Sequence, residues 1–142
     1  MRRLLLPLLA LLLLPAALPT SAGAVEVPTL GAAQHLAPVG DGWGTVAPSR
    51  IFNGGDPSGE VTGLRWERWG HARARGYGLT WLLRPGGGYY ERPGRIVLRA
   101  SRLGTCADGG AAYTRLDFRV APRPGEPADG RWRRWGGGDL CD

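Results

Sequence analysis

The stretch RIVLRASRL, at residues 95–103, decides the fold class of this chain. Ile96, Leu98 and Ala100 fall on one side of this stretch, and the residues between them fall on the other. A period of two residues is typical of a β-strand with one face against a core and one face toward solvent. We therefore predict a half-buried strand here.

The same period continues on both sides of this strand. Residues 112–120 place Ala112, Leu116 and Phe118 on one face, and residues 61–69 also alternate. Residues 72–82 alternate with very small residues opposite larger ones, so strands are expected to pack closely there. Glycine and proline mark loops at residues 85–88 and 122–130. Helical periodicity with caps is absent after residue 24. The pattern predicts an all-β fold, a small antiparallel sandwich or barrel of about five strands.

The N-terminal segment indicates export. Arg2 and Arg3 precede an apolar run at residues 4–18, and small residues follow up to Ala24. A short basic region, a short apolar run and an A-x-A ending are typical of a cleaved secretory signal peptide. We predict a signal peptide at residues 1–24, a secreted protein and no transmembrane segment after cleavage.

The remainder divides into two parts. Residues 25–49 mix proline, glycine and alanine without a period, which predicts an extended, partly disordered leader. Residues 50–142 are predicted to form a single β domain. The chain carries a net charge of +6, and removing the two signal arginines leaves an excess of four positive charges, so the mature protein is mildly basic.

Cys106 and Cys141 are the two cysteines of the sequence. In an oxidising compartment, an isolated pair is most simply one disulfide, which would tie the C-terminal segment to the domain. A zinc site needs more ligands, and His35 and His71 lie far away at no recognised spacing. No cofactor and no metal are predicted.

Five short motifs carry a resemblance to a known group of proteins. In order they are W-x-x-W-G at residues 66–70, A-x-G-x-G at 74–78, L-G-x-C at 103–106, A-Y at 112–113 and a closing cysteine at 141. The set resembles small secreted actinobacterial proteins of unknown function, over residues 51–141. The resemblance implies a compact, mainly β, extracellular domain with one disulfide and no established catalytic residues.

Catalytic arrangements are weakly supported. A serine hydrolase would draw on Ser49, Ser58 or Ser101 with His71 and Asp56 or Asp117, but none of these serines lies in a nucleophile-elbow sequence. A glycoside-cleaving site would require two facing carboxylates, which isolated acids could supply: Glu60, Glu67, Glu91, Asp108 and Asp117. Arginines surround nearly all of these acids, which is typical of solvated or paired surface carboxylates. We expect no enzyme.

Tryptophan and arginine give a stronger indication. Residues 131–135 read Arg131-Trp132-Arg133-Arg134-Trp135, where glycine and charge surround both rings. Exposed tryptophan can stack on a sugar while guanidinium groups hold anionic groups. Trp66 and Trp81 are more simply core residues. We therefore predict a binding site at residues 131–135, and nucleic acid is the weaker candidate ligand because the net charge is modest.

Together these features favour a non-catalytic binding or structural domain at the cell envelope. Its expected partner is a cell-wall polymer or an extracellular protein, bound as a glycan or anionic polymer through tryptophan and arginine. The alternative is a small secreted hydrolase or an inhibitor of a secreted enzyme, which would present a rigid loop at residues 84–95 or 122–130.

Overall fold

The computed structural model describes residues 25–123 and 129–142. The predicted signal peptide at residues 1–24 lies outside the described residues. Within these two ranges, no helix combines the length and apolar character required to cross a membrane.

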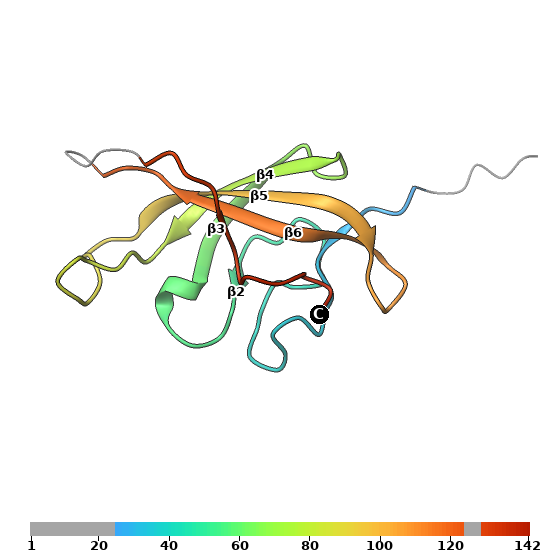
Figure 1. Cartoon of the computed structure of the whole chain (residues 1–142), viewed down its shortest axis with the longest axis horizontal. Coiled ribbons are helices and arrows are strands. Elements are labelled where there is room, and N and C mark those ends of the chain that lie inside the picture. The colour runs from blue at the N-terminus through green and yellow to red at the C-terminus, as the bar shows by residue number, and fades with distance from the viewer. Residues whose placement is uncertain (1–24, 124–128) are drawn as a thin grey trace, which may run out of the picture.

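The described residues form seven strands and one short 3₁₀ helix (Figure 1). The four long strands follow one another in the chain: β3 (Glu60–Glu67), β4 (Arg73–Thr80), β5 (Gly94–Thr105) and β6 (Ala111–Val120). The short strands are β1 (Thr29–Leu30), β2 (Ile51–Phe52) and β7 (Arg133–Arg134), and the 3₁₀ helix η1 spans Pro57–Gly59. The all-β prediction is confirmed.

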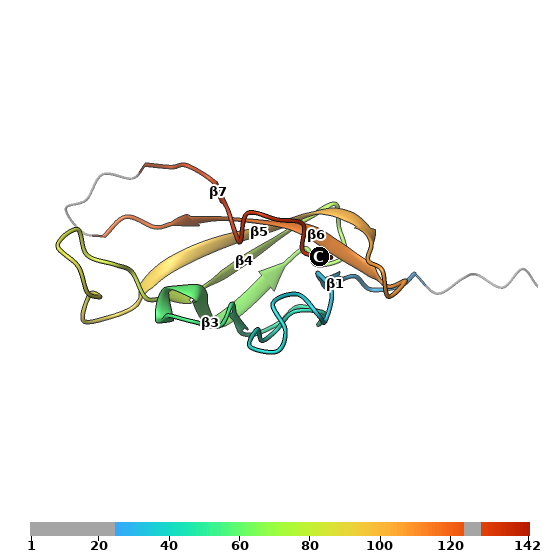
Figure 2. The ribbon, with the colours of Figure 1, turned by 60° about the horizontal axis from the view of Figure 1, so that its bottom comes forward.

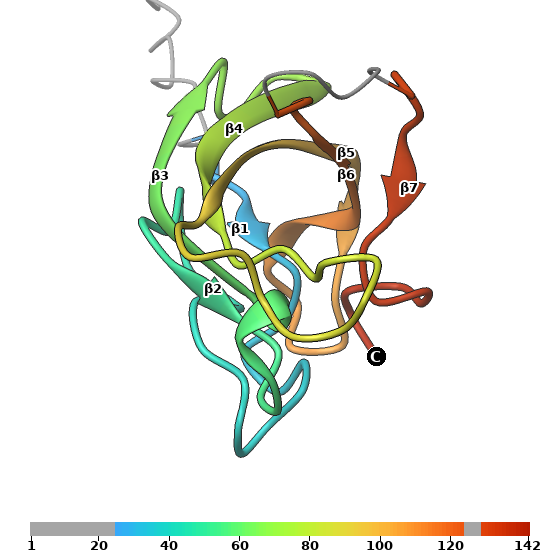
Figure 3. The same ribbon diagram turned by 90° about the vertical axis from the view of Figure 1, so that its left-hand side faces the viewer.

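The strands form one mixed sheet in the order β1-β6-β5-β4-β3-β2, with β7 also paired to β6. Neighbouring long strands are antiparallel, as predicted, whereas β1 runs parallel to β6. Seen end-on, the sheet curls into a half-barrel (Figure 3). At its edge, β7 runs beside β6 (Figure 2).

Alternate residues of β5 and β6 form the core. Leu98 lies opposite Phe118 and Ala100 lies opposite Leu116, so residues of one parity share the inner face. Leu98 and Ala100 are fully buried. Residues of the other parity, including Arg99, lie on the opposite side of the sheet, which we call the outer face.

Very small residues in β4 let a large ring lie against the sheet. Gly76 lies opposite Trp66 in β3, and a methyl group added at Gly76 would stand 2.9 Å from that indole. Trp66 is half-buried against the core and donates from Nε1 to the Pro48 carbonyl at 2.8 Å. The predicted close approach between small and large residues is confirmed at this pair.

Residues 25–49 do not form a separate leader, and the prediction that the domain begins near Arg50 is wrong. Leu30 of β1 is 0% exposed and Trp43 is buried in the same core. Trp43 donates from Nε1 to the Phe52 carbonyl, and Trp69 donates from Nε1 to the Pro28 carbonyl. The segment lacks a period because it packs through single anchor residues and turns rather than through a long strand.

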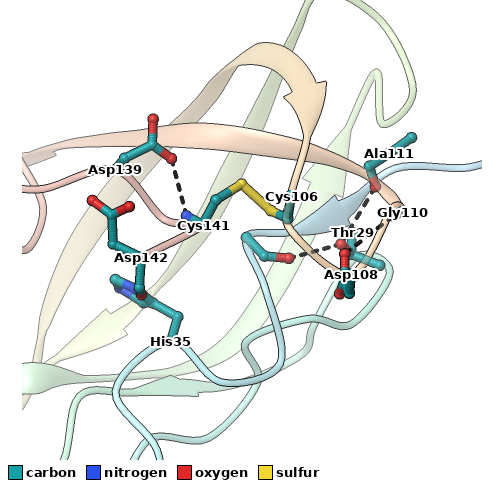
Figure 4. The surroundings of a disulfide bond; sticks show 10 residues. Thr29, His35, Cys106, Asp108, Gly110, Ala111, Asp139, Cys141 and Asp142 are labelled. Carbon is teal, nitrogen blue, oxygen red and sulfur yellow. Dashed lines mark hydrogen bonds between the residues drawn. A yellow bond between two sulfur atoms is a disulfide. The ribbon is translucent and has the colours of Figure 1, made fainter.

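The C-terminal segment is covalently bonded to the turn between β5 and β6. Cys106 and Cys141 form the predicted disulfide (Figure 4). Next to it, Leu140 is buried, its amide donates to the Thr114 carbonyl, and its own carbonyl accepts from Ala32. The disulfide therefore secures a segment that also contributes to the core.

Candidate functional site

Trp135 is a core residue, which corrects the prediction that its ring is available to a ligand. Its side chain is 5% exposed, and the ring meets Phe118 edge-on with 5.5 Å between centroids. The indole Nε1 donates to Oδ1 of Asn53 at 2.9 Å. Both the apolar body and the polar tip of this tryptophan already have partners.

Trp132 lies on the outer face. In the antiparallel pairing of β7 with β6, Arg134 lies opposite Asp117 and Arg133 lies opposite Phe118. Continuing this register by one residue places Trp132 beside Arg119, on the outer face. The ring is half-buried, with the guanidinium carbon of Arg99 4.3 Å from its centroid and that of Arg119 at 5.1 Å. Two cations thus share one indole.

The other three residues of the predicted site do not converge with Trp132. Arg133 forms an ion pair with Asp129, and Arg134 donates from Nη2 to the Gly138 carbonyl at 2.8 Å. The amide of Arg131 donates to the carboxylate of Asp129. These contacts shape the C-terminal segment, and the predicted cluster at residues 131–135 is divided between the core, local loop contacts and the outer face.

A larger cluster of arginines lies on the outer face of β4, β5 and β6. Arg75 lies opposite Arg99, and Arg99 in turn lies opposite Asp117. Two residues further along β5, Ser101 lies between Arg73 of β4 and Arg115 of β6. The two-residue period of a strand therefore gathers guanidinium groups from three strands on one surface.

This surface contains two adjoining hollows. The first is lined by Glu67, Arg68, His71, Ala72, Arg73, Ala74, Arg75 and Arg99. The second is lined by Ala72, Arg73, Arg99, Ser101, Arg102, Arg115 and Asp117. The two hollows are adjacent, because three residues line both of them: Ala72, Arg73 and Arg99. Together they present six arginines against two carboxylates, an excess of four positive charges.

Asp117 is the buried residue among those that line the second hollow. Its side chain is 2% exposed, yet it accepts hydrogen bonds from Arg115 Nε and Nη2 and from Arg99 Nη2, at 2.9–3.1 Å. Burial raises the pKa of this carboxyl, but the hydrogen bonds from Arg115 and Arg99 outweigh burial and hold the pKa below its ordinary value. Asp117 is therefore an anion that orders two cations.

The remaining arginines of the hollows are held less tightly. Among ion pairs between described residues, none involves Arg68, Arg73, Arg75 or Arg102. Arg73, Arg75 and Arg102 are exposed. Their donors face solvent and are available to an anionic group. The surface is chemically suited to binding anions.

Four of the candidate catalytic residues make structural contacts, His71 through its backbone carbonyl. Asp56 caps η1, and Ser58 donates to it through both its amide and its hydroxyl, which lowers the pKa of Asp56. The carbonyl of His71 accepts from the Tyr113 hydroxyl at 2.5 Å. Asp117 is bonded to arginines rather than to a histidine. Within the described ranges, no three metal-ligating side chains come together.

The arginine cluster was missed in the sequence although its signal is present. Arg73 and Arg75 are two residues apart and Arg115 and Arg119 are four apart, so each pair lies on one face of its strand. Reading each strand alone cannot show that these faces adjoin, because that depends on strand order and register. The site was predicted at residues 131–135 instead because tryptophan and arginine are adjacent there in the sequence.

Comparisons with known proteins return no relative. No family model matches the chain, and neither the curated proteins nor the solved structures contain a significant match.

Proposed function

We propose that this protein is a non-catalytic binding domain that holds an anionic polymer at the cell envelope. The contact surface is the pair of hollows on the outer face of β4–β6. The observation that carries the proposal is the gathering of six arginines and two carboxylates on these hollows, with most of the arginines free of ion pairs between described residues.

Binding of a polymer is supported by the shape and continuity of the surface. The hollows are open and are lined by residues of four strands, β3 to β6, and the shared residues Arg73 and Arg99 connect them. Guanidinium groups form charge-assisted, bidentate hydrogen bonds with carboxylate and phosphate groups. A chain with repeated anionic groups can occupy both hollows at once, which raises its affinity above that of a single group.

Two further features are consistent with work outside the cytoplasm. The predicted signal peptide would export the chain, and the disulfide between Cys106 and Cys141 is of the kind that persists in an oxidising compartment. An exported protein with a basic face would meet the anionic polymers of the envelope first. We therefore place the binding there.

The proposal is tested with residues 25–142 and a panel of polymers: an anionic dextran series, polyglutamate and neutral dextran. Binding is measured by titration calorimetry at several salt concentrations. We expect the anionic polymers to bind, neutral dextran not to bind, and affinity to fall as salt rises because counterions compete.

A matched pair of variants separates the hollows from general positive charge. R73A/R75A removes two arginines of the hollows, and R65A/R95A removes two exposed outer-face arginines that line neither hollow. We expect R73A/R75A to weaken binding about tenfold, because each exposed arginine contributes an ion pair of about 0.7 kcal/mol. Equal losses in both variants, or no binding of any anionic polymer, would overturn the proposal.

A further inference from the structure

We propose that Asp117 and Trp132 are positioning residues that fix Arg99 and Arg115 as a receptor for a phosphate-type oxyanion in the second hollow. The inference rests on the proposed function and names the anionic group that the polymer carries. It depends on a specific arrangement of donors rather than on the excess of positive charge.

The first observation is how Asp117 holds the two arginines. Arg115 donates from both Nε and Nη2, and Arg99 donates from Nη2 alone. Each guanidinium therefore keeps further N–H groups that no hydrogen bond between described residues uses. Because Asp117 is buried and both arginine side chains are 30% exposed, the unused donors are presented toward the hollow.

The second observation is the contact between Arg99 and Trp132. The guanidinium carbon of Arg99 lies 4.3 Å from the centroid of the indole. Arg99 is thus restrained on one side by a carboxylate and on another by an aromatic ring. A long arginine side chain held this way loses little further freedom on binding a ligand. Trp132 contributes to binding through Arg99, rather than by stacking on a sugar.

The third observation concerns the number of donors. Arg73, Arg99, Arg102 and Arg115 line the second hollow, against the single carboxylate of Asp117, which is already paired. A carboxylate ligand brings two oxygens and one charge. A phosphate ester brings three oxygens and up to two charges, so it can accept from several guanidinium groups at once. The donor set fits the tetrahedral oxyanion better.

The test compares three polymers with one backbone and equal charge density: phosphorylated, sulfated and carboxymethylated dextran. We expect phosphorylated dextran to bind about tenfold more tightly than carboxymethylated dextran. The sulfated polymer shows whether three oxygens suffice or whether the second charge is needed. Equal affinity for phosphorylated and carboxymethylated dextran would overturn the inference.

The variant Asp117→Asn distinguishes a positioned receptor from binding by net positive charge alone. The substitution raises the net charge by one, so a purely electrostatic surface would bind phosphorylated dextran more tightly. A positioned receptor would instead bind it about five- to tenfold more weakly, because Arg99 and Arg115 lose their anchor. Unchanged or tighter binding by a folded Asp117→Asn variant would contradict the inference.

Two variants that keep the net charge serve if Asp117→Asn fails to fold. Arg99→Lys removes the planar fork, and Trp132→Leu removes the ring beside it, while Arg65→Lys is the control on the same face. We expect the first two, as folded proteins with a cooperative thermal transition, to lose the preference for phosphate over carboxylate, and the control to keep it. If all three keep the preference, the inference falls.

The two proposals fail separately. If R73A/R75A weakens binding of every anionic dextran while the phosphate preference is absent, the binding function stands and the positioned receptor does not. If no anionic dextran binds, both fall.

Discussion

The indole Nε1 of Trp135 donates a hydrogen bond to Oδ1 of Asn53 at 2.9 Å, across 82 residues of sequence. The bond joins the C-terminal segment after β7 to the turn after β2. The same indole packs edge-on against Phe118 of β6. One side chain thus connects three parts of the domain that are far apart in the chain.

Trp135→Ala should therefore unfold easily. Removing a buried tryptophan typically lowers the free energy of unfolding by about 3–5 kcal/mol. Asn53→Ala should cost about 1 kcal/mol, because it leaves the indole N–H without its partner. Urea denaturation measures both. Trp132→Ala is the control, since its ring is only half-buried, and a loss at Trp132 as large as that at Trp135 would contradict this account.

Removal of residues 25–49 should prevent folding. The deletion would take away Leu30 and Trp43, both buried, together with the parallel pairing of β1 with β6. We expect a protein starting at Arg50 to show no cooperative thermal transition. In the longer protein, the amide of Leu30, which donates to the Thr45 carbonyl, should be protected in hydrogen exchange. Rapid exchange at Leu30 would restore the interpretation of this segment as a leader.

Reduction of the disulfide should lower stability substantially. The bond joins residues 35 apart, and closing a loop of that size contributes about 3–4 kcal/mol in the chain-entropy model. We expect dithiothreitol to lower the melting temperature of the wild type and to leave that of C106S/C141S unchanged. A wild-type protein insensitive to reductant would show that packing of Leu140 alone holds the C-terminal segment.

The ion pairs of Asp117 should make stability fall in acid. The pKa of Asp117 is lowered in the folded protein, so its stabilising contribution is present above the unfolded-state pKa of about 3.9 and is lost as pH falls through the lower folded-state value. The gap in melting temperature between wild type and Asp117→Asn should therefore shrink from about pH 6 to about pH 2. A constant gap would mean that the arginines stabilise no charge at this position.

Gly76→Ala should be destabilising although alanine is small. The added methyl group would stand 2.9 Å from the indole of Trp66, so ring or strand must shift. Strain of this kind lowers the free energy of unfolding by about 1–3 kcal/mol. Gly86→Ala is the matched control, because a methyl group there meets no atom within 4 Å. Equal stability of the two variants in thermal melts would show that Trp66 yields without cost.

The strands could be predicted because their evidence is local. In β5, Ile96, Leu98 and Ala100 alternate with Val97, Arg99 and Ser101, which reflects burial on one face, and the observed strand follows this pattern. The disulfide could be predicted because the sequence offers a single pair of cysteines. Such features depend on neighbouring residues or on simple counting.

The C-terminal tryptophans could not be assigned for a different reason. Trp132 and Trp135 have similar neighbours in sequence, yet one lies on the outer face and the other in the core. Which ring is buried depends on the two-residue pairing of β7 with β6 and on the distant Asn53. Likewise, Asp117 resembles any charged strand residue until register places Arg99 beside it.

The edge of β6 is closed by segments from opposite ends of the described chain. The amide of Gly31 bonds to the Tyr113 carbonyl, and those of Trp135 and Leu140 bond to the carbonyls of Leu116 and Thr114. Contacts at such wide sequence separation form late, because the intervening chain must be ordered first. The hydrogen bonds at this edge of β6 cannot all form until Leu140 has been synthesised. Folding is therefore expected as one slow, concerted step that begins only once the whole domain is available.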